Sequence, residues 1–92
     1  MEPKNYAPVI EKYIEKILLP KFPEIDEFLV QSGSRSDGKE GGYLYIIFYT
    51  KGKMRSWFRN KLHHKIQQMR SYVSIPESIM IYYDINKGNN LS

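Results

Sequence analysis

The sequence predicts an α+β fold, a small two-layer sandwich whose elements follow the order α-β-β-α-β. Two segments, residues 6–18 and 54–73, repeat apolar residues every three or four positions, which is typical of helices that cover a core with one side. The segment GYLYIIFYT, residues 42–50, places its side chains alternately on two faces, as a strand does. A chain of 92 residues has room for one domain, residues 1–92.

The first helix is predicted over residues 6–18. Pro8 suits the first turn, and Pro20 followed by Pro23 ends the helix and turns the chain. Glutamate and lysine stand between the apolar positions, so the helix has one apolar and one charged side. The apolar positions are Tyr6, Ile10, Tyr13, Ile14, Ile17 and Leu18.

A hairpin with a long connection is predicted next. Residues 25–31 are short and β-prone, and residues 42–50 form the second strand. Residues 32–42 between them are rich in Gly, Ser and Asp and contain no anchoring apolar group, so they predict a flexible loop. A long polar loop in so small a domain is often functional.

The second helix is predicted over residues 54–73, after a break at Lys51-Gly52-Lys53, and Pro76 ends it. The third strand covers residues 79–83. Because a helix joins the second and third strands, we expect them to be parallel in one mixed three-stranded sheet, with both helices on one face. The polar tail, residues 86–92, is expected to be flexible.

This topology leaves one face of the sheet open. Leu44, Ile46 and Phe48 are expected to face the helices, although the sequence alone leaves open which side of the strand is buried. The same element order occurs in KH-like and other small RNA-associated α+β modules. That similarity is one of fold alone, because the GXXG loop of a KH domain is absent. The tyrosines expected on the open face are Tyr43, Tyr45, Tyr49 and either Tyr82 or Tyr83.

Composition removes several classes of protein. The chain has no cysteine, which excludes disulfides, thiolate metal sites and a cysteine nucleophile. The N-terminus lacks the pattern of a signal peptide, and no segment contains the roughly 18 apolar residues that cross a bilayer. We therefore expect a soluble cytoplasmic protein that does not contact a membrane.

The net charge of +4 is unevenly distributed. Residues 1–50 contain six Lys or Arg and eight Asp or Glu, a balance of −2, whereas residues 51–92 contain eight and two, a balance of +6. From Lys51 to Pro76 there are seven basic residues and no acidic one. An anionic partner is therefore expected to bind this segment.

The basic helix has two interpretations. In the first, it follows a phosphate backbone, with Arg59, His63 and Arg70 on one flank, Lys61 on the other, and Trp57 in the first turn available for stacking. In the second, it is a solvated helix surface that is basic by chance. Lys51-Gly52-Lys53 is likewise either an anion site before a helix or a plain turn.

The sequence gives no sign of catalysis. Ile47 and Met54 stand where a P-loop requires glycine and Ser or Thr. His63 and His64 point about 100° apart on a helix, so they cannot share a metal ion. The acidic residues have no catalytic spacing and the serines no nucleophile elbow. We expect no enzyme activity, no cofactor, no metal site and no small-molecule substrate.

The first hypothesis is a non-enzymatic module that binds RNA or single-stranded nucleic acid. Phosphates would contact the basic segment, bases would stack on Trp57 and Tyr45, and Arg35 and Lys39 on the loop would close over the ligand. The predicted phosphate contacts are Lys51, Lys53, Arg55, Arg59, Lys61 and Arg70.

The second hypothesis is a small structural or assembly protein, such as a viral or phage component or a subunit of a larger complex. Tyrosine is favoured at protein interfaces as well as under nucleobases. The tyrosine face would then join a protein partner or a second copy of the chain, and the basic half would meet an acidic protein surface. The interface residues in this case are Tyr43, Tyr45, Tyr49 and Tyr82.

Overall fold

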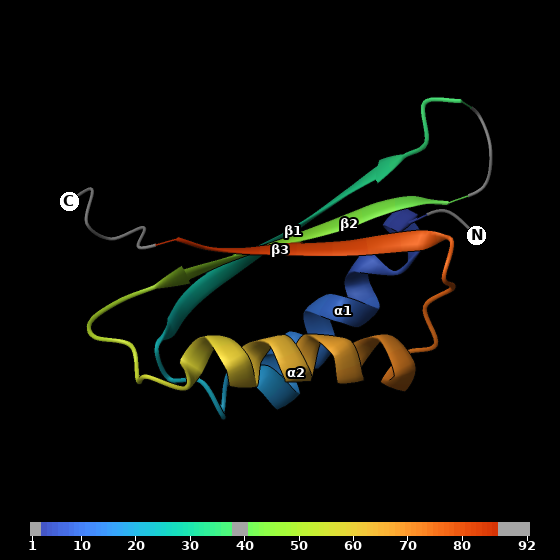
Figure 1. Ribbon diagram of the computed structural model, residues 1–92. Helices are drawn as coiled ribbons and strands as arrows, with labels where there is room; N and C mark the ends of the chain where they lie inside the picture. The colour runs from blue at the N-terminus through green and yellow to red at the C-terminus, as the bar shows by residue number, and fades with distance from the viewer. Residues whose placement is uncertain (1–2, 38–40, 87–92) are drawn as a thin grey trace.

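The computed structural model describes residues 3–37 and 41–86, and it confirms the predicted fold class and element order (Figure 1). Three strands form one sheet in the order β1-β2-β3, with β1 antiparallel and β3 parallel to the central β2. Both helices lie on the same face of this sheet (Figure 1). The elements are α1 (Ala7–Tyr13), β1 (Ile25–Ser34), β2 (Gly42–Thr50), α2 (Phe58–Tyr72) and β3 (Ile79–Asn86).

The first helix changes its pitch part of the way along. A 3-10 turn over Pro3–Asn5 precedes α1, and the chain continues beyond α1 as a π-helix over Ile14–Leu18. The amide of Leu19 donates to the carbonyl oxygen of Ile14 at 2.9 Å, the five-residue spacing of a π-helix. Most of the segment 6–18 is therefore helical, as predicted, but it consists of an α-helix followed by a π-helix.

The hairpin pairs further than the sequence predicts. The register of β1 and β2 continues to the pair of Ser34 and Gly42, so residues 32–34 belong to the strand and the connection covers residues 35–41. Gly33 lies opposite Tyr43, and a Cβ on Gly33 would stand 2.3 Å from Cε1 of that tyrosine. The tyrosine ring therefore covers the glycine, which explains how a Gly-Ser segment is held in a strand.

Two predictions of flexibility fall partly outside the described residues. Residues 38–40 of the predicted loop and residues 87–92 of the predicted tail are not described. Asn86, the first residue of the predicted tail, is the last residue of β3.

The second helix begins at Phe58, four residues later than the predicted start at Met54. The amide of Arg55 and its guanidinium both bond to the carboxylate of Glu24, which lies just before β1. This tertiary contact holds residues 54–57 outside the helix. Lys51-Gly52-Lys53 is consequently a turn at the end of β2, with Gly52 at a φ of +69°, and not the N-terminus of a helix.

The core lies between the sheet and the helices. Leu44, Ile46 and Phe48 are completely buried on the helix-facing side of β2, as predicted. On β3 the register places Tyr83 on this side and Tyr82 on the other. The helices contribute the buried residues Ile10, Tyr13, Ile14, Leu18, Phe58, Leu62, Ile66 and Met69.

Candidate functional site

The turn after β2 and the first turn of α2 carry a cationic surface, defined here as Lys51, Lys53, Trp57, Arg59 and Lys61. Arg59 and Lys61 lie on opposite flanks of the helix, because they are two positions apart. All five residues are exposed. No acidic residue occurs in the chain between Lys51 and Pro76, so no carboxylate from this segment neutralises the surface. A helix of 15 residues, such as α2, extends for about 22 Å.

An open hollow lies beside this surface, at the end of β2. Its volume is about 400 Å³, and Lys51, Lys53 and Arg55 line it together with Pro23, Glu24 and Gly52. Lys51 also forms an ion pair with Asp26, with 3.2 Å between Nζ and Oδ1. The structure therefore brings three predicted phosphate contacts together, and Lys51 has an exposed carboxylate next to it.

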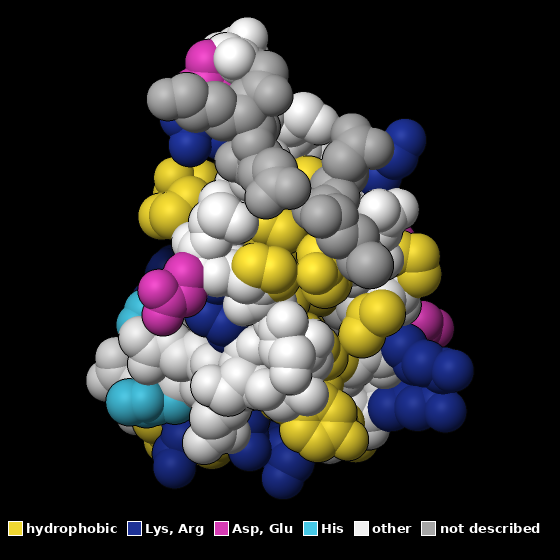
Figure 2. Space-filling model, turned by 90° about the vertical axis from the view of Figure 1, so that its right-hand side faces the viewer, with side chains coloured by type: hydrophobic (Ala, Val, Ile, Leu, Met, Phe, Trp, Pro, Cys, Tyr) yellow, Lys and Arg dark blue, Asp and Glu magenta, His cyan; other side chains and the backbone are white. Residues whose placement is uncertain are grey.

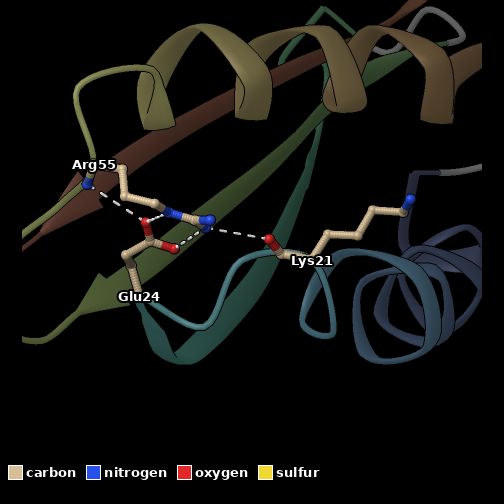
Figure 3. Close-up of polar contacts among 3 residues, drawn as sticks. All are labelled: Lys21, Glu24 and Arg55. Carbon is tan, nitrogen blue, oxygen red and sulfur yellow. Dashed lines mark hydrogen bonds and ion pairs between the residues drawn. The ribbon is translucent and has the colours of Figure 1, made fainter.

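Arg55 has a structural partner (Figure 3). Its guanidinium donates to both carboxylate oxygens of Glu24, at 2.6 Å from Nη2 to Oε1, and to the carbonyl oxygen of Lys21 at 3.3 Å. The Glu24 side chain is only 6% exposed, and its hydrogen bonds from Arg55 hold the pKa of the carboxyl below its usual value despite burial. The same contact raises the pKa of Arg55, so this guanidinium is already occupied in joining two loops.

Trp57 is the predicted stacking residue, and it caps the start of α2. Its side chain is 41% exposed. The Arg55 guanidinium carbon lies 4.0 Å from the centroid of the Trp57 ring, a cation–π contact. One part of the ring is therefore covered, and stacking by a base would use the remaining exposed part.

Arg70 lies at the other end of α2 and also has a structural role. Its Nη1 donates to the carbonyl oxygen of Pro76 at 2.9 Å, and its Nη2 donates to the carbonyl oxygen of Ile79. These bonds attach the last turn of α2 to the start of β3. The structure thus separates Arg70 from the cationic surface by most of the helix.

The flank of α2 that faces β3 contains Arg59 and His63. His63 Nδ1 lies 3.0 Å from Oη of Tyr83. Burial raises the pKa of Tyr83, and the nearby positive charge of Arg59 partly opposes this change. The rings of His63 and His64 are 6.3 Å apart between centroids. Within the described residues, no three His, Cys, Asp or Glu side chains gather in a way that could hold a metal ion.

The described residues of the hairpin loop lie away from the cationic surface. Arg35 forms a local pair with Asp37, at 3.2 Å from Nε to Oδ1 and 2.6 Å from Nη2 to Oδ2. The loop connects the ends of β1 and β2 that lie farthest from Lys51, along a nine-residue strand (Figure 1). Lys39 lies outside the described residues.

No described element covers the sheet face away from the helices, and we call it the open face. Large apolar side chains remain exposed there, including Leu29, Tyr43, Met80 and Tyr82. Glu27 and Asp84 are its acidic residues, and the described residues of this face include no Lys or Arg. Strand alternation and register give its membership: Glu27, Leu29, Gln31, Gly33, Tyr43, Tyr45, Ile47, Tyr49, Met80, Tyr82, Asp84 and Asn86.

A hollow of about 520 Å³ lies at the open face. It is lined by Tyr43, Tyr45, Tyr82, Tyr83 and Asp84. The hydroxyl of Tyr45 donates to Oδ2 of Asp84, and this bond to the carboxylate raises the pKa of the tyrosine. The hollow therefore combines aromatic rings with one carboxylate that accepts a hydrogen bond from Tyr45.

The sheet separates the open face from the cationic surface. Alternation with the buried Leu44 and Ile46 directs Tyr45 away from the helices, whereas Trp57 and Lys61 lie at the N-cap and in the first turns of α2. The predicted stacking residues Tyr45 and Trp57 are thus not brought together. Sequence reasoning missed Asp84, Leu29 and Met80 as residues of the open face, although alternation along β1 and β3, continued from Tyr82, would have found them.

A smaller hollow of about 180 Å³ lies between the two helices. Val9, Ile17 and Tyr72 contribute apolar surface to it, with Lys12 and Lys16 at its border. Figure 2 shows the side of the molecule at the right of Figure 1, where hydrophobic side chains form a strip with Lys and Arg side chains beside and below it. The helical layer therefore has some exposed apolar surface of its own.

No helix among residues 3–37 and 41–86 has the length and hydrophobicity needed to span a bilayer. No protein-family model matches this chain, and no curated protein or solved structure matches it significantly. The geometry of the two surfaces is therefore the basis for any functional assignment.

Proposed function

We propose that this protein is a non-enzymatic module that binds RNA or single-stranded nucleic acid through its cationic surface. The observation that carries the proposal is that Lys53, Arg59 and Lys61 are exposed on a segment without any acidic residue. These three residues form no ion pair within the described part of the chain. Their charges are thus available to phosphates.

Stacking supports a single-stranded ligand. Trp57 is partly exposed, four residues after Lys53 and two before Arg59, and unpaired bases stack on such rings. The inner side of α2 is buried against the sheet through Phe58, Leu62 and Ile66. The helix is therefore poorly placed to insert into the major groove of duplex DNA, which favours a single-stranded ligand. Arg55 and Arg70 support the fold instead of the ligand, because backbone and carboxylate groups already occupy them.

The test is a titration with a fluorescent single strand of mixed sequence at several salt concentrations. Three to four phosphate contacts on a single strand predict that log Kd changes with log salt with a slope of about 2 to 3. Charge reversal by Arg59→Glu with Lys61→Glu should abolish micromolar binding, since it replaces two attractions with two repulsions.

Lys12→Glu with Lys16→Glu provides the matched control. Both lysines are exposed on the first helix, and the pair changes the net charge by the same amount. It should weaken binding far less than the α2 pair. Equal losses for the two pairs would mean that net charge alone attracts the strand, and binding that survives the α2 pair would refute the proposal.

The second candidate function is assembly with another protein through the open face. The exposed apolar residues of this face favour it, because large uncovered apolar patches usually mark an interaction surface. Tyr45→Ala with Tyr49→Ala removes two rings from the centre of the face. If a second copy covers the face, light scattering should give a dimer or larger assembly for the original protein and a monomer for this variant. A monomer in both cases would remove self-assembly.

A further inference from the structure

We infer that the open face docks a cationic peptide segment, with an Arg or Lys side chain seated against Tyr82 and Asp84. This inference rests on the second candidate function and names the chemistry of the partner. Its first support is charge. The described residues of the open face contain two carboxylates, Glu27 and Asp84, and no base, although the chain as a whole is basic.

The geometry of the hollow fits a cationic side chain. Tyr43, Tyr45 and Tyr82 present π-systems around a space of about 520 Å³, and Asp84 lies in the same lining. A guanidinium or ammonium group is attracted to the face of an aromatic ring and to a carboxylate at the same time. Tyr82 is 50% exposed, so its ring is accessible to a ligand.

The hydrogen bond from Tyr45 orients the Asp84 carboxylate for a cationic ligand. The Tyr45 hydroxyl donates to Oδ2 and thereby restricts the rotation of the Asp84 side chain. A carboxylate has about four acceptor positions, so one hydrogen bond leaves room for the N–H groups of an arginine. A restricted carboxylate loses less conformational entropy when it binds.

Other occupants suit the face less well. Phosphates would meet Glu27 and Asp84, and the described residues of the open face supply no cation to offset the repulsion. A second copy packed symmetrically would also place these carboxylates in an interface that supplies no base of its own. A cationic segment is the occupant that satisfies both the rings and the acid.

The experiment uses a fluorescein-labelled peptide of four Arg-Ala repeats, titrated by anisotropy in low salt, with an otherwise identical citrulline peptide as the neutral control. The arginine peptide should bind and the citrulline peptide should not. Tyr82→Ala and Asp84→Asn should each weaken binding by about two- to fivefold, the range of one exposed cation–π or charge contact. Amide NMR shifts on peptide addition should map to β2 and β3.

Tyr72→Ala is the matched control, because Tyr72 is a 72% exposed tyrosine on α2. It should leave the Kd within about 1.5-fold of the original, below the smallest loss expected for a cation–π contact. The inference is overturned if the peptide does not bind, or if both open-face variants bind it unchanged. It is also overturned if Tyr82→Ala instead dissolves a homo-oligomer or weakens binding of the single strand. The Arg59→Glu with Lys61→Glu variant tests the cationic surface. Whether it loses nucleic-acid binding does not change the conclusion drawn from the peptide titration.

Discussion

At the scale of single residues, the contact between Glu24 and Arg55 has the clearest consequence. Glu24 is nearly buried, whereas Arg55 is 41% exposed and also contacts Trp57. A buried carboxylate is tolerated because the guanidinium satisfies both of its oxygens. This pair links the segment before β1 to the segment before α2.

Glu24→Gln is expected to lower the free energy of unfolding by about 1.5 kcal/mol, near the lower end for a hydrogen bond to a charged group, since water can hydrate Arg55 after the change. The pKa of Glu24 is lowered on folding from its ordinary value of 4.5, so its contribution is complete above that pH and is lost as the pH falls through the lowered value. Urea denaturation between pH 6 and pH 3 should therefore show a smaller loss of stability for the variant than for the original protein.

Asp26→Asn is the control for this measurement. It removes the ion pair with Lys51, whose two side chains are both about half exposed. Such surface pairs contribute roughly 0–1 kcal/mol, so the stability should hardly change. A pH profile for Glu24→Gln that is as steep as the original would show that other carboxyl groups control acid unfolding.

At the scale of elements, the closed end of the hairpin depends on a glycine. Gly42 has a φ of +142°, and a Cβ there would stand 2.2 Å from the backbone carbonyl oxygen of Gly33 on the paired strand. A side chain would thus strain the backbone and also push β1 away from β2. The pair of Ser34 and Gly42 can form only with glycine at this position.

Gly42→Ala is expected to destabilise the protein by about 3 kcal/mol, the combined cost of the strained φ and of overpacking against a fixed backbone atom. Gly52→Ala is the comparison, because Gly52 also has a positive φ but a Cβ there has open space around it. It should cost about 1 kcal/mol, the penalty for the left-handed conformation alone. If urea denaturation gave the same loss of stability for both variants, the close contact between the new Cβ and the Gly33 carbonyl oxygen would have no energetic cost.

At the scale of the whole molecule, the sheet divides two surfaces of opposite character. The helical layer has the cationic surface, and the open face has tyrosines and carboxylates. A ligand on one surface has no direct contact with the other. Under the functions proposed above, the two surfaces would bind their partners separately.

The two double variants should act independently. Arg59→Glu with Lys61→Glu is expected to remove single-strand binding without changing the molar mass, and Tyr45→Ala with Tyr49→Ala is expected to leave the Kd for the strand within about twofold, since distant sites without shared partners are additive. A variant with all four changes should lose single-strand binding to the same extent as the α2 pair and have the same molar mass as the tyrosine pair. A further loss of strand binding from the tyrosine pair would place Tyr45 in the nucleic-acid site after all.

Hydrophobic periodicity predicted the fold class correctly because it is a local property. Alternation placed Leu44, Ile46 and Phe48 on one strand face, which the structure shows to be buried, and the helical crossover led us to expect β3 parallel to β2. Boundaries were less predictable. The start of α2 depends on Glu24, which is 31 residues away from Arg55 in the sequence, and the extension of β1 depends on the Tyr43 ring over Gly33.

The sequence by itself determined the element order, the apolar sides of the helices and the location of the basic segment, because these follow from the spacing of neighbouring residues. Only the tertiary structure decided which charges remain available. It paired Arg55 with Glu24, directed Arg70 to backbone carbonyls and placed Asp84 beside Tyr45. It also put Tyr45 and Trp57 on opposite sides of the sheet. Contacts between residues far apart in the chain make these assignments, and no local pattern encodes them.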